Sequence, residues 1–127
     1  MKTTSKRETT TLNIILFDNG IASFRAKPSM TREFTLKDVR EIHAEIITFN
    51  RVNRLFLIHI ENGMYSLEAR KYLANVEKTL ADKIAMVAQK PLQKVVGNFF
   101  LGINRPPIPI KLFTNQDEAK EWLLLKA

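Results

Sequence analysis

The stretch that decides the fold is Leu55–Ala88, which reads LFLIHIE (55–61), NGMYS (62–66), LEARKYLANVEKTLAD (67–82) and KIAMVA (83–88). The first and last segments are uninterrupted apolar runs of strand length, and the third has its apolar residues at helical spacing. Continuous apolar strands are buried on both faces, which is typical of parallel sheets covered by helices. We therefore predict a strand–helix–strand unit whose two strands run parallel.

A hairpin and a helix are predicted ahead of this unit. Two short apolar runs, 12–17 and 21–26, are separated by Asp-Asn-Gly, and Asn-Gly is a strong hairpin signal. Thr35 then begins a helix, with Asp38 placed to complete a capping box. Residues 1–11 (MKTTSKRETTT) lack a core-forming pattern, so we predict a flexible amino-terminal tail.

The remainder of the chain predicts a helix, a strand and a closing helix. Pro91 suits the first turn of a helix whose apolar face is broad. The run 108–113 contains Pro109, which has no N–H to donate, so its strand belongs at a sheet edge or pairs only after that residue. Thr114 or Asn115 caps the last helix. The sequence thus predicts a mixed α/β sheet of about five strands, opened by a hairpin and covered by about four helices, as a single domain over residues 12–127.

Composition narrows the class of protein. A chain of 127 residues with 45% hydrophobic and 26% charged residues is typical of one globular domain. The absence of cysteine excludes disulfides, thiolate nucleophiles and cysteine metal sites. No apolar run has the length of a signal peptide core or a membrane span, so we expect a soluble cytoplasmic protein without membrane insertion.

The net charge of +7 is spread along the chain: about +2 over residues 1–11, +2 over 12–60 and +3 over 61–127. Proteins that bind nucleic acid gather their cations on one face to displace counterions. Basic and acidic residues alternate here instead, so we expect no nucleic-acid partner.

Residues that carry chemistry are sparse. His59 lies in the middle of a predicted buried strand, where it needs a hydrogen-bond partner, and His43 lies beside the apolar stripe of the first helix. Two histidines without cysteine or closely spaced carboxylates do not form a zinc site, and no Gly-x-Ser-x-Gly elbow is present. We therefore expect no metal, no cofactor, no catalytic residues and no enzyme activity.

Three segments resemble a known family: GMYSLEAR (63–70), KPLQKVVGNFF (90–100) and LFTNQDEAKEWL (112–123). Together with the order of elements, they are similar to STAS domains and, more closely, to the SpoIIAA-like small bacterial proteins. The resemblance covers about residues 12–126. It implies a STAS-like fold and a regulatory or protein-interaction role.

The resemblance also draws attention to Ser66. In signalling STAS proteins, a Ser or Thr at the start of the helix after the central strand is phosphorylated within an Asp-Ser-Ser/Thr-Gly pattern. Ser66 lies at this place, although its neighbours Met64, Tyr65 and Leu67 do not match the pattern. Ser66 is thus either a phosphoacceptor, favoured by the helix N-terminus, or a plain N-cap.

Topology predicts where a ligand or partner would bind. Ligands of open α/β sheets bind beyond the carboxyl ends of parallel strands, so we expect the ends of the two central strands to form a rim. The residues of this rim are Asn62, Gly63, Ser66, Arg70, Gln89 and Lys90. Helix N–H groups and cations there suit an anion or a partner's carboxylate, and solvated surface residues are the alternative.

A second candidate site is apolar. The segment 99–103 has more apolar residues than one helix face needs, and Phe99, Phe100 and Leu101 suit a protein partner, a second copy of the chain, a pocket for a greasy ligand, or the core. The preferred function is a non-enzymatic STAS-like regulatory or interaction domain with a protein partner or a homodimer. The alternative is a binder of a small apolar or anionic molecule between helix and sheet.

Overall fold

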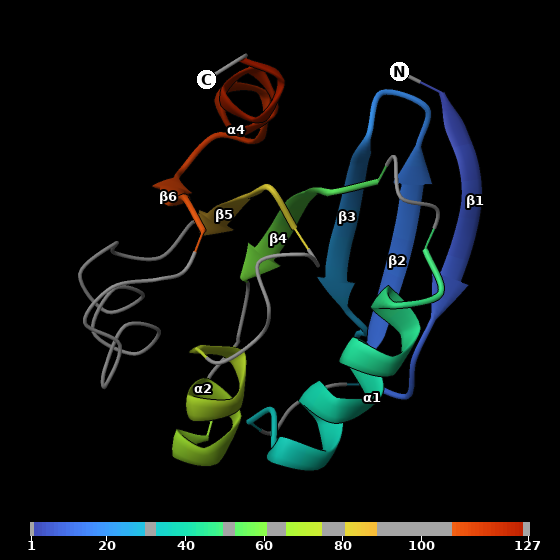
Figure 1. Ribbon diagram of the computed structural model, residues 1–127, viewed down its shortest axis with the longest axis vertical. Helices are drawn as coiled ribbons and strands as arrows, with labels where there is room; N and C mark the ends of the chain where they lie inside the picture. Colours follow the sequence, from blue (N-terminus) through green and yellow to red (C-terminus); the bar gives the residue numbers. More distant parts are fainter. Residues whose placement is uncertain are drawn as a thin grey trace.

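The computed structural model describes residues 2–29, 33–49, 53–60, 66–74, 81–88 and 108–125. Its centre is one six-stranded sheet in the order β1-β2-β3-β4-β5-β6 (Figure 1). The strands are β1 (Thr3–Glu8), β2 (Leu12–Phe17), β3 (Ile21–Ala26), β4 (Leu55–Ile60), β5 (Lys83–Ala88) and β6 (Ile110–Phe113). The first three are antiparallel neighbours, and β3 to β6 run parallel.

The predicted strand–helix–strand unit is confirmed. β4 and β5 pair in parallel from Leu55 opposite Lys83 to Ile60 opposite Ala88, with helix α2 (Leu67–Ala74) between them in the chain. β6 lies at the edge and begins directly after Pro109, as the missing N–H of that residue predicts.

Two helices follow their predicted starts. Helix α1 (Leu36–Ile46) begins after Thr35, whose side chain accepts from the Asp38 N–H while the Asp38 carboxylate accepts from the Thr35 N–H. This reciprocal pair is a capping box. Helix α4 (Gln116–Leu124) begins after Asn115, whose side chain accepts from the N–H groups of Asp117 and Glu118.

The helices divide between the two faces of the sheet. On one face α1 lays Ile42 on a core that includes Ile14, Phe24 and Phe56, and α2 packs beside α1. On the other face Ala119 and Leu123 of α4 bury Leu57 and Ala85. Figure 1 accordingly shows α1 and α2 near one end of the molecule and α4 near the other.

The prediction of a flexible tail over residues 1–11 is wrong. Thr3–Glu8 forms β1, the outer strand beside β2, and raises the strand number from about five to six. Its sequence, TTSKRE, has no apolar residue. Hydrophobic periodicity therefore gave no signal, whereas charged residues suit an edge strand because they discourage pairing with other chains.

The hairpin was predicted correctly, but its loop differs from a two-residue Asn-Gly turn. Three residues, Asp18 to Gly20, connect β2 and β3, and Gly20 alone has a positive φ, of 93°. The Asn19 side chain instead accepts from the Ile21 N–H at 3.1 Å. A three-residue loop that ends with glycine in the left-handed region is a common hairpin connection.

The fourth predicted helix, which begins near Pro91, lies outside the described residues. No helix in the described part of the chain is long and apolar enough to span a bilayer.

Candidate functional site

The two strand ends from which the rim was predicted lie side by side. The last residues of β4 and β5, Ile60 and Ala88, are partners in the sheet, so the carboxyl ends of the two strands are adjacent. Ser66 follows as the N-cap of α2: its hydroxyl accepts from the Ala69 N–H at 3.1 Å, and its own N–H donates to the Phe34 carbonyl at 2.9 Å. The hydroxyl therefore has a structural role, and phosphorylation of Ser66 stays a prediction.

Of the other predicted site residues, only Arg70 lies in the part of the chain that the structure describes. Arg70 belongs to α2. The remaining rim residues Asn62, Gly63, Gln89 and Lys90, and the apolar residues Phe99, Phe100 and Leu101, lie outside the described part of the chain. Their roles as a ligand site or an interface stay predictions.

A different candidate emerges on the face of the sheet that α4 covers. Two rows of neighbouring side chains cross the strands there: Glu8, Asn13, Arg25, His59, Val87 and Phe113 in one, and Lys6, Ile15, Ser23, Leu57, Ala85 and Lys111 in the other. α4 contacts β4, β5 and β6. Leu57, Ala85, Val87 and Phe113 are buried there, and Lys111 at the edge of the sheet is exposed. Toward β1 both rows become polar and accessible.

We call this accessible part the open face: Lys6, Glu8, Asn13, Ile15, Ser23, Arg25 and His59. Lys6, Glu8, Asn13 and Arg25 are exposed, and the other three are half-buried. A solvated face is ordinary for antiparallel strands, but β4 is a parallel strand, and such strands are usually covered on both faces. The half-exposed His59 of β4 is therefore the unusual residue of the open face.

His59 is held by two hydrogen bonds to β3. Its Nδ1 lies 3.0 Å from Nη2 of Arg25, and its Nε2 lies 3.2 Å from the Ser23 hydroxyl. A guanidinium group can only donate, so Nδ1 accepts and carries no proton. The proton of the neutral ring is therefore on Nε2, which donates to Ser23.

The surroundings also keep this ring neutral. Burial lowers the pKa of His59 first, and the positive charges of Arg25 and Lys120 lower it further, to about 4. Burial penalises the charged form of a histidine, and nearby cations act in the same direction. His59 is accordingly uncharged at neutral pH.

This arrangement is the reverse of a hydrolase dyad. In a Ser-His-Asp triad the aspartate holds the proton on Nδ1, which leaves Nε2 free to take the serine proton. Here Arg25 occupies Nδ1, so Nε2 already carries a proton and cannot accept one from Ser23. The low pKa of His59 also makes it a weak base at neutral pH.

The second histidine, His43, connects the two helices α1 and α2. His43 of α1 hydrogen-bonds through Nδ1 to the Tyr72 hydroxyl of α2, and the Arg40 guanidinium of α1 lies 5.9 Å from the centre of the Tyr72 ring. Among the described residues, no group of three or more His, Cys, Asp and Glu side chains is placed to hold a metal ion.

Sequence reasoning identified His59 and its need for a partner but missed Arg25 and Ser23. These residues are 34 and 36 positions away, and only the parallel register of β3 and β4 places them beside the ring. The burial of Asn53 was missed as well. This residue is 5% exposed and its side-chain amide donates to the carbonyls of Phe17 and Ile21, whereas an asparagine in a polar connector carries no signal of burial.

Comparison with known proteins identifies the family. The model of a domain of unknown function, DUF7793, matches residues 15–125. The chain belongs to the DUF7793 family. Among solved structures, this DUF7793 chain is similar to an uncharacterized DUF3478-family protein from Shewanella loihica PV-4 with a SpoIIAA-like fold. The two are 18% identical with a TM-score of 0.54, over 94% of this chain and 99% of that one.

This structural similarity confirms the SpoIIAA-like α/β fold predicted for the DUF7793 chain. The search of curated proteins gives no match.

Proposed function

We propose that the DUF7793 chain is a non-enzymatic interaction domain whose open face binds an acidic surface of a partner protein. The observation that carries the proposal is the composition of this face around His59. Arg25 and Lys6 contribute two cations from the strands, and Lys120 of α4 lies near enough to His59 to lower its pKa. Complementary charge steers a partner toward such a surface.

The acidic residue of the open face does not offset these cations fully. Glu8 forms an ion pair with Lys27, with 3.4 Å between Nζ and Oε2. The half-buried Ile15 adds apolar area between the charged side chains. Arginine beside accessible apolar area is a composition found at protein interfaces.

The proton position on His59 supports a binding role over a catalytic one. Both ring nitrogens are engaged by β3, and the ring is neutral with its proton directed at Ser23. A fixed neutral histidine serves here to hold Arg25 in place beside it. The alternative ligand pocket predicted from the sequence involves Phe99 and Phe100, which lie outside the described residues.

Charge reversal tests the proposal. Proteins would be cross-linked to the wild-type chain and to Arg25→Glu in a lysate of the organism that makes the protein, then identified by mass spectrometry. Lys37→Glu is the matched control, because Lys37 is an exposed cation of α1 outside the open face. We expect acidic partners that are cross-linked to the wild type and to Lys37→Glu at low salt, but neither at high salt nor to Arg25→Glu.

Urea unfolding of all three chains shows whether Arg25→Glu stays folded. A folded Arg25→Glu that retains the same partners as the wild type contradicts the proposal. Native mass spectrometry of the purified chain separates a foreign partner from a second copy, since a homodimer appears without lysate.

A further inference from the structure

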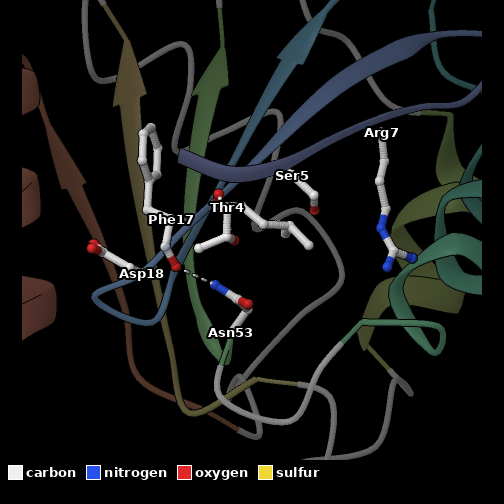
Figure 2. A pocket seen from close by; sticks show the side chains of 7 residues that line it. Thr4, Ser5, Arg7, Phe17, Asp18 and Asn53 are labelled. Atoms are coloured by element: carbon white, nitrogen blue, oxygen red, sulfur yellow. Dashed lines mark hydrogen bonds between the residues drawn. The ribbon is translucent and has the colours of Figure 1, made fainter. Parts of the chain in front are cut away.

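A hollow of about 360 Å³ lies between β1, the end of β2 and Asn53 (Figure 2). The polar side chains beside it are engaged within the chain. Arg7 pairs with Glu45 of α1. The Asn53 amide donates to the carbonyls of Phe17 and Ile21, and Figure 2 shows the first of these bonds. These contacts hold β1 and the start of β4 in place, so the hollow is part of the fold.

Helix α4 has two opposite sides. Ala119 and Leu123 face the sheet and are buried. Asp117, Glu121 and Leu124 are exposed, and they are spaced three or four positions apart, so they form one stripe on the side away from the sheet. Neither carboxylate of this stripe forms an ion pair with a described residue. The outer side of α4 is therefore acidic and ends in an apolar side chain.

The open face carries the complementary charge. Lys6 and Arg25 are its exposed cations, and the half-buried Ile15 is the neighbour of Lys6 in the sheet. The acidic residue of the open face, Glu8, is paired with Lys27. A basic surface with an exposed apolar residue on the strands thus matches an acidic stripe with an exposed leucine on the helix.

The open face and α4 lie beside each other on the same side of the sheet. α4 contacts β4, β5 and β6, whereas the open face extends over β1, β2 and β3 as far as His59 of β4. Neighbouring strands are about 4.8 Å apart and a helix is about 10 Å wide, so three strands have about the width of one helix. This side of the sheet is therefore half covered, and its open half has room for one more helix.

We infer, resting on the proposed function, that the open face of one chain binds the outer side of α4 of a second copy. When two half-covered sheets stack about a two-fold axis, each α4 lies on the open face of the other copy, and the same contact forms twice. The two α4 helices then share one layer between two sheets. The carboxylates of each α4 meet Lys6 and Arg25 of the other copy, and Leu124 meets Ile15.

This dimer is weak. Exposed ion pairs contribute little each, and the net charge of +7 on each copy opposes association. At an ionic strength of about 0.15 M the Debye length is about 8 Å, so the repulsion between the two net charges is screened more than the contacts inside the interface. We expect a dissociation constant of about 0.1 mM, so that the chain is mostly monomeric at about 10 µM.

Sedimentation equilibrium of the full chain from about 10 µM to about 1 mM measures the dimer. Arg25→Glu and Glu121→Arg each place like charges in both contacts, so each should raise the dissociation constant about tenfold. Lys37→Glu is the matched control for Arg25→Glu, because it changes the net charge by the same amount at an exposed residue of α1, outside both surfaces. It should dimerise at least as well as the wild type.

The two reversed chains together give the sharpest test, because each repels itself and complements the other. In an equimolar mixture, the reversed open face of Arg25→Glu meets the reversed α4 of Glu121→Arg, and the unchanged surfaces of the two variants meet each other. We expect a heterodimer with about the dissociation constant of the wild type. Urea unfolding shows whether each variant is folded. If Arg25→Glu does not fold, Lys6→Glu takes its place in both measurements.

Three results overturn the inference. The first is a wild-type chain that stays monomeric at about 1 mM. The second is a dimer that neither reversal weakens, and the third is a mixture of the two folded variants that forms no heterodimer. The proposed function fails separately: partners from the lysate that are cross-linked to Glu121→Arg but not to Arg25→Glu still support it, because a foreign acidic surface binds the open face without α4 of a second copy.

Discussion

At the scale of single residues, the properties of His59 are set by its neighbours. A histidine in a strand is neutral or charged according to burial and nearby charge. Arg25 fixes the proton on Nε2, and burial with two cations keeps the ring neutral. The same residue type beside an aspartate would have the opposite proton position and a higher pKa, and with them a different chemistry.

The pH dependence of stability follows from this lowered pKa. His59 takes up a proton at pH 6.5 when unfolded but only at about pH 4 when folded. As the pH falls below 6.5, the unfolded chain gains a proton that the folded chain does not, so the free energy of unfolding decreases until about pH 4 and this effect then levels off. In His59→Gln, the free energy of unfolding should lack the part of this decrease that comes from His59.

Urea unfolding of the wild type and His59→Gln across this pH range measures the effect. The difference between the two free energies of unfolding should change with pH below 6.5 and stay constant above it. A constant difference throughout the range would contradict the lowered pKa.

At the scale of elements, local chemistry predicted the helix starts. Thr35 and Ser66 were predicted as caps, and Asn115 as one of two alternatives with Thr114. The side chains of Thr35, Ser66 and Asn115 each accept a backbone N–H in the first turn of a helix. Such contacts join residues two or three positions apart, so the sequence contains both partners. β1 was missed because its sequence, TTSKRE, has no apolar residue and so shows no hydrophobic periodicity, although its partner β2 follows closely in the chain.

The capping box of α1 gives a prediction at this scale. Thr35→Ala removes the acceptor of the Asp38 N–H and one partner of the buried Asp38 carboxylate. We expect it to lower the free energy of unfolding by about 1 kcal/mol, the usual cost of losing an N-cap. Thr35→Ser keeps the hydroxyl and should cost much less. Equal losses for the two variants, measured by urea unfolding, would show that the methyl group of Thr35 matters more than the cap.

At the scale of the whole molecule, β1 completes the sheet. It shields the edge of β2, which carries the core residues Leu12, Ile14 and Leu16. It also joins the sheet to α1 through Arg7, and the adjoining Thr10 bonds to Glu41 through its N–H and its hydroxyl. The strand therefore links both the edge and the helix layer to the core.

Deletion of residues 2–8 tests this role. Without β1, the apolar β2 becomes a sheet edge with unpaired N–H and C=O groups, which promotes association between chains. We expect a lower urea midpoint and concentration-dependent light scattering from the shortened chain. If the shortened chain unfolds at the wild-type midpoint and stays monomeric, β1 does not stabilise the sheet, and residues 2–8 behave as the flexible tail predicted from the sequence.

The sequence by itself determined the order of the elements from the hairpin to β5, the parallel pairing of β4 with β5, and the helix caps. These features depend on apolar periodicity and on contacts between residues close in the chain. Only the tertiary structure decided that β1 joins the sheet, that Arg25 and Ser23 meet His59, and that Asn53 borders a hollow. These contacts depend on strand register and on which half of a face α4 leaves accessible, and no short stretch of sequence encodes either.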